Sequence, residues 1–267
     1  MHLFPPQGIF ISFDGSFDGF LCVVHDVYYM KLKPSGIQCT QELTLAQDIH
    51  VTKTDLSKAE TVLSAISKKI SEKAASRVYY GFLSHDPRRF MPLLEYIRLG
   101  FRVGHMVDSH LHEDCVRTVH DLARQSGKEA HLLNGFCRFQ ETSQGVLYAQ
   151  VSPRNDVLVL LAEHFRERLM NEAWIIHDKG RRQAAVYDGS SYIITPAGQA
   201  NFTLAEGEAE MQELWAGFFK TIAIKERTNK KLQRQLLPMY FRRYMTEFFQ
   251  MGAQEMNKEL LSHQLQK

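Results

Sequence analysis

The chain has 267 residues, of which 44% are hydrophobic and 23% are charged, and its formal net charge is +2. These values are ordinary for a globular protein of one or two domains. They exclude a disordered chain and a polycation that would bind nucleic acid with its whole surface. The four cysteines include no Cys-x-x-Cys pair, which argues against a zinc cluster and against a secreted disulfide scaffold. Prolines at positions 5 and 6 and the lack of a long apolar run predict no signal peptide, no membrane segment and a cytoplasmic protein.

One strand and several helices are expected in the first half of the chain. The apolar run 8–13 predicts a strand that ends in a turn at Asp14-Gly15, and Ser16 is a good N-cap for a helix that follows. The two Phe-Asp-Gly triplets of this stretch therefore belong to different local structures, a turn and a first helical turn. The other expected elements are a loop with a short strand at 33–55 and helices at 56–75 and 87–100.

Residues 113–133 give the clearest helical pattern, with apolar residues on one side. Another side carries a basic stripe, which consists of Arg117, His120, Arg124, Lys128 and His131. The two histidines lie three turns apart, about 16 Å along a straight helix, so they cannot share one metal ion. The stripe is a candidate for phosphate contact, and Gly127 is expected to mark a bend.

The pattern then changes to short strand-like runs separated by turn sequences such as "SQG", "DKGR" and "DGSS". One amphipathic helix, introduced by Asn155 or Asp156, interrupts them and gives the order ββαβββ. This order predicts an α+β fold with a central antiparallel sheet and helical layers from the N- and C-terminal parts. No low-complexity linker is present, so we expect one composite domain over 1–267. Its parts are a mainly helical segment 1–133, the sheet with its helix at 134–205, and a helical segment 206–267.

A basic and aromatic stretch near the end, residues 225–244, is the strongest physical signal for nucleic acid. Seven basic residues stand there against one acidic residue, with Tyr240 and Phe241 among them. Cations neutralise phosphates, and aromatic rings stack on unpaired bases. The alternative is a solvated basic helix whose aromatic side chains pack in the core.

Catalytic signals are weak. His120, His177 and Asp178 are the acid–base candidates, but no nucleophile motif, phosphate loop or dinucleotide fingerprint accompanies them. Residues 105–115 are rich in His, Asp and Glu without a known metal-ligand spacing. The sequence leaves open whether the protein is an enzyme and favours a protein without catalysis; we expect no metal and no cofactor.

A series of motifs runs along nearly the whole chain: "FDGSFDGF", "LGFRVG", "VHDLARQSGKEAHLLNGFCRF", "GVLYAQVSP", "LLAEHF", "WIIHDKGRRQAAVYDG", "LWAGFFKTIAIKERTNKKLQRQLLP" and "YMTEF". In this order they resemble one bacterial family of DNA metabolism or DNA repair proteins. Many members follow the late proline with a basic-Tyr-Trp run, whereas this chain has Met239, Tyr240, Phe241 and Arg242 after Pro238. If that tryptophan stacks on a base, Tyr240 or Phe241 must replace it here.

The resemblance implies a context more than a mechanism. The family is encoded beside a radical-SAM partner that modifies or repairs DNA, and it also occurs fused to uracil-DNA-glycosylase-like domains. Our first hypothesis is a DNA-binding accessory protein that acts with that partner; the alternatives are a hydrolase or other enzyme acting on damaged or modified nucleic acid, and a protein-interaction scaffold without DNA contact. The predicted nucleic-acid contacts are Arg117, Arg124, His131, Arg227, Asn229, Lys230, Lys231, Arg234, Tyr240, Phe241, Arg242 and Arg243.

Overall fold

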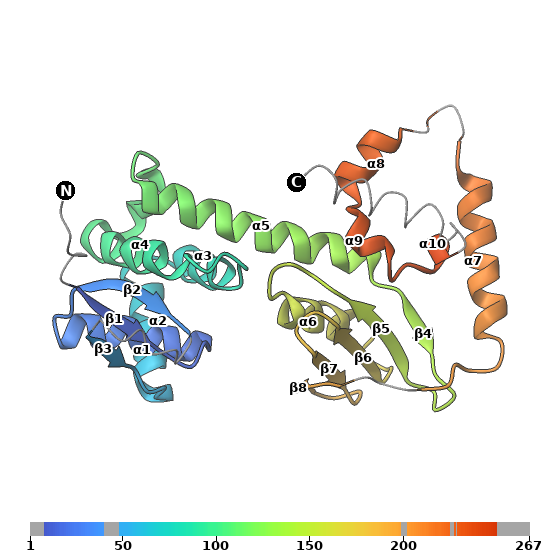
Figure 1. The fold of residues 1–267 in the computed structure, drawn as a ribbon, viewed down its shortest axis with the longest axis horizontal. Helices are drawn as coiled ribbons and strands as arrows, with labels where there is room; N and C mark the ends of the chain where they lie inside the picture. Colours follow the sequence, from blue (N-terminus) through green and yellow to red (C-terminus); the bar gives the residue numbers. More distant parts are fainter. Residues whose placement is uncertain (1–7, 40–47, 199–201, 225–226, 228, 250–267) are drawn as a thin grey trace. The chain divides into compact units, whose positions relative to one another are not determined.

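A computed structural model describes residues 8–39, 48–198, 202–224, 227 and 229–249, without the side chains of Lys220, Lys230 and Phe249 (Figure 1). Contacts within the chain divide it into two compact units, Met1–Lys128 and Glu129–Lys267. The division falls inside one helix and not at a polar linker, which is why no change in composition marks it. That residues 1–267 form one composite domain is still a prediction.

The first unit contains a small parallel sheet that the sequence pattern only partly predicted. Strand β1 (Ile9–Ser12) lies between β2 (Pro34–Gln38) and β3 (Ile49–Val51) and is parallel to both. The strand β1 was predicted, while β2 and β3 fall in the region expected to be a loop with one short strand. Helix α1 (Phe17–Tyr29) begins as predicted at Ser16, whose hydroxyl oxygen accepts a hydrogen bond from the Gly19 N–H.

Three helices and a short 3-10 segment complete the packing of this unit. They are α2 (Leu56–Lys69), α3 (Glu72–Phe82), α4 (Phe90–Val103) and η1 (Gly104–Ser109). The single helix expected at 56–75 is two helices, because Ser71 caps a new one by accepting from the Ala74 N–H. Helix α4 continues through Gly100, where a β-carbon would lie only 2.5 Å from Ile70 Cδ1, and ends at Gly104 with a φ of 66°.

Helix α5 (Asp114–Phe136) matches the clearest helical prediction and crosses the division between the units. Its buried residues Val116, Val119 and Leu122 belong to the first unit, and Ala130 and Leu133 belong to the core of the second. The helix is continuous through Gly127, where we expected a bend.

The second unit is built on a five-stranded sheet with the order β4-β5-β6-β7-β8. The strands are β4 (Phe139–Glu141), β5 (Leu147–Val151), β6 (Trp174–Asp178), β7 (Gln183–Tyr187) and β8 (Tyr192–Pro196), with α6 (Leu158–Arg168) between β5 and β6. The predicted α+β class and the order ββαβββ are therefore confirmed. The sheet is mixed, however, and not fully antiparallel, because α6 carries the chain back so that β6 runs parallel to β5.

The core of this unit lies between one face of the sheet, α6 and the C-terminal helices (Figure 1). Trp174 and Ile176 of β6 point into it. The helical C-terminal part was predicted, and it consists of α7 (Glu208–Ile222), α8 (Lys230–Leu236), α9 (Met239–Arg242) and α10 (Thr246–Phe249). The ring of Phe219 on α7 lies 5.7 Å from that of Phe248 on α10.

Candidate nucleic-acid interface

Helices α3 and α5 line two adjacent hollows of about 510 and 300 Å³ in the first unit. Arg77, His120 and Arg124 line both of them. Arg117 lines the larger hollow, and Lys73 lines the smaller. We call this surface, defined by Lys73, Arg77, Arg117, His120 and Arg124, the α3–α5 surface.

A carboxylate behind this surface fixes two of its side chains. Arg77 Nη2 donates to Asp108 Oδ2 at 3.0 Å, and Arg77 Nε lies 3.0 Å from Oδ1 in an ion pair that lacks the geometry of a hydrogen bond. The hydroxyl of Tyr96 donates to Asp108 Oδ1 at 2.8 Å, and His120 Nε2 lies 2.9 Å from the same oxygen.

The chemistry of this cluster favours an ionised Asp108. Burial alone would raise the pKa of Asp108, but the hydrogen bonds from Arg77, Tyr96 and His120 outweigh it and hold the pKa below its usual range. Burial, and then its hydrogen bond to Asp108, raise the pKa of Tyr96, which stays a neutral donor. Since an anion beside Nε2 favours a proton on that nitrogen, Nδ1 of a neutral His120 is left as an acceptor.

The carboxylates that pair with Arg117 and Arg124 are exposed residues of the same helix, and Arg117 also donates to the carbonyls of Leu111 and His112. Arg124 Nη2 lies 2.7 Å from Asp121 Oδ1, with the two side chains 75% and 59% exposed. Arg117 pairs in the same way with Asp114. Exposed pairs of this type contribute about 0–1 kcal/mol, so a phosphate can replace the carboxylate at little cost.

The predicted contacts in the second unit are dispersed. His131, Arg227, Lys231, Arg234 and Arg243 are exposed, and the side chain of Lys230 lies outside the described residues. The Asn229 side chain caps α8 by accepting from the Leu232 N–H. Arg242 is buried, with its guanidinium 5.1 Å from the ring of Phe248. Burial of its side chain argues against the predicted contact of Arg242, while the contact of Asn229, which is exposed, stays a prediction.

Base stacking by Tyr240 or Phe241 is also revised. Phe241 is buried in the core cluster. The Tyr240 hydroxyl donates to Glu129 Oε1 at 3.1 Å, and the Arg154 guanidinium lies 5.0 Å from its ring. Burial, together with the nearby Glu129, raises the pKa of Tyr240 to about 12. Both side chains therefore follow the alternative prediction for residues 225–244, in which the aromatic side chains pack against the core and do not stack on bases.

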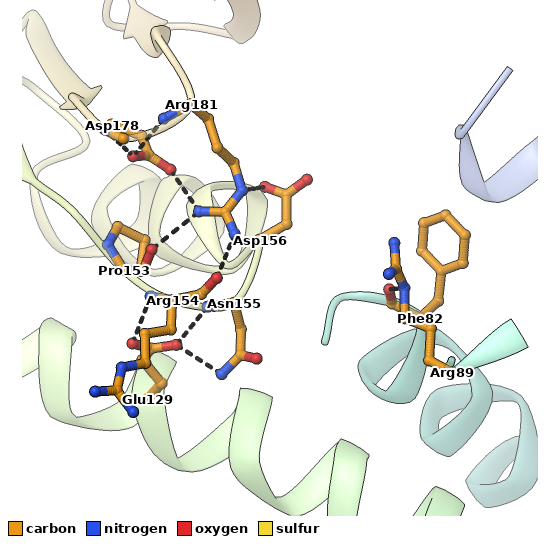
Figure 2. Close-up of polar contacts among 10 residues, drawn as sticks. Phe82, Arg89, Glu129, Pro153, Arg154, Asn155, Asp156, Asp178 and Arg181 are labelled. Carbon is orange, nitrogen blue, oxygen red and sulfur yellow. Dashed lines mark hydrogen bonds and ion pairs between the residues drawn. The ribbon is translucent and has the colours of Figure 1, made fainter. Parts of the chain in front are cut away.

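His177 and Asp178 do not form an acid–base pair, because neighbouring residues of a strand point to opposite faces of the sheet. His177 is 2% exposed and its Nδ1 lies 2.8 Å from the Tyr148 hydroxyl; burial lowers its pKa. Asp178 accepts from the N–H groups of Gly180 and Arg181 and from the Arg181 guanidinium, which also donates to the Pro153 carbonyl (Figure 2). The role of Asp178 in the structure is to hold a turn.

In the described ranges, no group of three or more His, Cys, Asp or Glu side chains is arranged to hold a metal ion. No helix in the part of the chain described here is long and apolar enough to cross a bilayer.

Sequence reasoning missed Lys73, Arg77, Tyr96 and Asp108. Lys73 and Arg77 lie one turn apart on α3, and the Ser71 cap that starts this helix was a usable signal for them. Asp108 joins side chains from three other segments, and such long-range contacts leave no local pattern.

Residues 87–247 match the sequence pattern of a domain of unknown function, DUF4130. No curated protein matches the chain. Among solved structures, the chain is similar to a pGpG-specific phosphodiesterase, PggH, from Vibrio cholerae, with 8% sequence identity and a TM-score of 0.31. The similarity covers 67% of this chain and 81% of the other. A TM-score this low carries no argument about function.

Proposed function

The chain belongs to the DUF4130 family, a domain of unknown function, and we propose that it binds nucleic acid through the α3–α5 surface. One observation carries the proposal: Lys73, Arg117 and Arg124 gather from two helices around adjoining hollows. Cations that surround a hollow can neutralise neighbouring phosphates of one strand, and the displaced counterions add to the affinity.

The family resemblance supplies the biological context of the proposal. It implies a DNA repair or DNA metabolism protein that acts together with a radical-SAM partner. In this context the α3–α5 surface would hold DNA by its backbone while the partner performs the chemistry. Exposed cations of the second unit, among them Lys231 and Arg243, would add non-specific contacts.

Fluorescence anisotropy with labelled single- and double-stranded oligonucleotides over a range of salt concentrations tests this proposal. Arg124→Ala should weaken binding about fivefold at low salt, the equivalent of about 1 kcal/mol. It should also reduce the salt slope by about 0.9 on a duplex or about 0.7 on a single strand, since one phosphate contact is lost. Lys73→Ala should behave alike.

Arg88→Ala is the matched control. Arg88 is an exposed arginine of the same unit that pairs with Asp86 and lines neither hollow. Arg88→Ala removes the same charge as Arg124→Ala. Equal losses of DNA affinity in the two variants would therefore show that the net charge of the protein matters and not the α3–α5 surface. No detectable binding at low salt would contradict the proposal altogether.

The Asp108–His120 contact favours an enzyme as second candidate. A histidine whose one ring nitrogen is held by a carboxylate is oriented to use the other as a general base. The substrate class would be damaged or modified nucleic acid. Oligonucleotides with defined lesions should then be converted by the full chain and not by His120→Gln, while Arg88→Ala stays active; unchanged conversion by His120→Gln would exclude this role.

A protein partner is the third candidate, and the surface of α7 favours it. Met211, Leu214, Phe218 and Ile222 recur at helical spacing and are exposed. A contiguous apolar face of this kind is typical of an interaction site. Co-expression with the neighbouring radical-SAM protein and size-exclusion chromatography would test it: Leu214→Glu should abolish a complex that Glu213→Gln leaves intact.

A further inference from the structure

A hollow of about 410 Å³ lies in the first unit between α1, α2 and the end of α4. It shares no lining residue with the α3–α5 surface. Its volume is within the range of about 300–1,000 Å³ that is usual for small-molecule sites. The two surfaces can therefore be tested separately.

Aromatic rings form the walls of this hollow. The rings of His25 and Tyr29 are stacked, with centroids 4.2 Å apart and an interplanar angle of 16°. Tyr28 meets Phe101 edge to face at 5.6 Å. Tyr29 is 73% exposed, so the side chains described leave most of it open to solvent. Rings presented in this way offer stacking area to another planar group.

The buried carboxylate of Asp26 contacts His25, whose ring forms part of the wall of this hollow. Asp26 Oδ1 lies 3.5 Å from His25 Nδ1, and Asp26 Oδ2 accepts from Thr52 and lies 3.0 Å from His50 Nε2. Three side chains hold Asp26 in place: those of His25, of His50 on β3, and of Thr52 directly after β3. The wall is thus pre-organised, which lowers the entropic cost of stacking a ligand on it.

One cation lines this hollow. Lys69, in the last turn of α2, lines it, and none of the side chains that line it is acidic. Within the described residues, Lys69 contacts no carboxylate. Its ammonium is available to an anion on the ligand.

We propose that this hollow binds a nucleotide, that is, a planar heteroaromatic ring that carries a phosphate. The ring stacks beside Tyr29 and His25, and the phosphate pairs with Lys69. The proposal does not rest on the α3–α5 surface. The nucleotide can be free in solution or an unpaired nucleotide of a strand, because both present the same ring and the same anion.

Isothermal titration of the full chain with AMP, adenosine and ribose 5-phosphate tests the proposal. We expect AMP to bind more tightly than either fragment, because only AMP supplies both groups. Tyr29→Ala should weaken AMP binding about tenfold, the loss expected for one aromatic stack. Lys69→Ala should reduce it about fivefold, and Ala65→Phe should block it by filling the hollow. Lys68→Ala, an exposed neighbour that does not line the hollow, should bind as the unchanged protein does.

Several results would overturn the proposal. They are the absence of AMP binding at millimolar concentration, equal binding of adenosine and AMP, and equal losses for Lys68→Ala and Lys69→Ala. Circular dichroism of each variant separates a lost contact from a lost fold.

A further arm distinguishes the two sources of the nucleotide. If Tyr29→Ala weakens binding of single-stranded but not double-stranded DNA, the site holds an unpaired nucleotide; if it weakens only AMP, the ligand is free. Arg124→Ala should leave AMP binding unchanged, so failure of this site and failure of the DNA interface give different results. Loss of AMP binding in Arg124→Ala would overturn the assignment to this hollow.

Discussion

Replacing Glu129 with alanine should destabilise the second unit strongly. Glu129 lies on α5, is 6% exposed, and its carboxylate accepts hydrogen bonds from three other residues. The N–H groups of Arg154 and Asn155 donate at 2.8 Å and the Asn155 side-chain amide at 2.6 Å (Figure 2). The Tyr240 hydroxyl donates at 3.1 Å. One side chain thus joins α5 to the loop after β5 and to α9.

The magnitude follows from the donors that alanine would leave without an acceptor. A buried donor without a partner costs about 1–3 kcal/mol. Both bonds from Asn155 are buried, whereas those from Arg154 and Tyr240 are partly buried, so water can replace part of the latter. The sum is on the order of 3–5 kcal/mol, a large share of the roughly 5–15 kcal/mol that stabilises a typical domain.

Urea denaturation followed by tryptophan fluorescence measures this loss, because both tryptophans of the chain, Trp174 and Trp215, lie in the second unit. Glu167→Ala is the control, since Glu167 is an exposed glutamate on α6 of the same unit. It should cost no more than about 1 kcal/mol. If Glu129→Ala lowers the free energy of unfolding by no more than this control, the carboxylate does not hold the three segments together.

Three further predictions concern charge and pH. Asp121→Asn should raise DNA affinity about twofold to fivefold in the anisotropy assay, because it releases Arg124; a loss of affinity would contradict the interface. The pKa of Asp108 is lower in the folded protein than in the unfolded chain, where it is about 4. Its contribution to the free energy of unfolding is therefore complete above about pH 4 and is lost as the pH falls through the pKa of the folded state. Hydrogen exchange in α3 and α4 should accelerate over that window, and Asp108→Asn should flatten the dependence. His177 also has a lowered pKa, so the second unit should lose stability as the pH falls from about 7 to 5; His177→Leu should remove this slope, and an unchanged slope would assign it to another group.

Local patterns predicted the elements well because the signals that set them are local. The Ser16 cap, the long helical pattern that became α5 and the turn sequences between the strands act over a few residues, and each was found. Only one short strand was expected at 33–55, where the structure has β2 and β3, because "PSGIQ" and "IHV" are short; both strands are stabilised by pairing with β1, which lies far away in the sequence.

The candidate site was predicted only in part, for the same physical reason. Arg117, His120 and Arg124 share one helix, so helical periodicity placed them together. Arg77 and Asp108 reach them through tertiary contacts that no spacing along the chain reveals. In the C-terminal stretch, composition suggested stacking aromatics, but burial decided otherwise, since Phe241 contributes more by filling the core than by facing solvent.

Helix α5 supplies buried side chains to both units. Val116 and Val119 are buried in the first unit and Leu133 in the second. A fragment of the chain that ends before Asp114 therefore loses part of the buried surface of the first unit, and a fragment that begins after Phe136 loses part of the core of the second. Each unit, produced separately, would have to carry its own part of this helix.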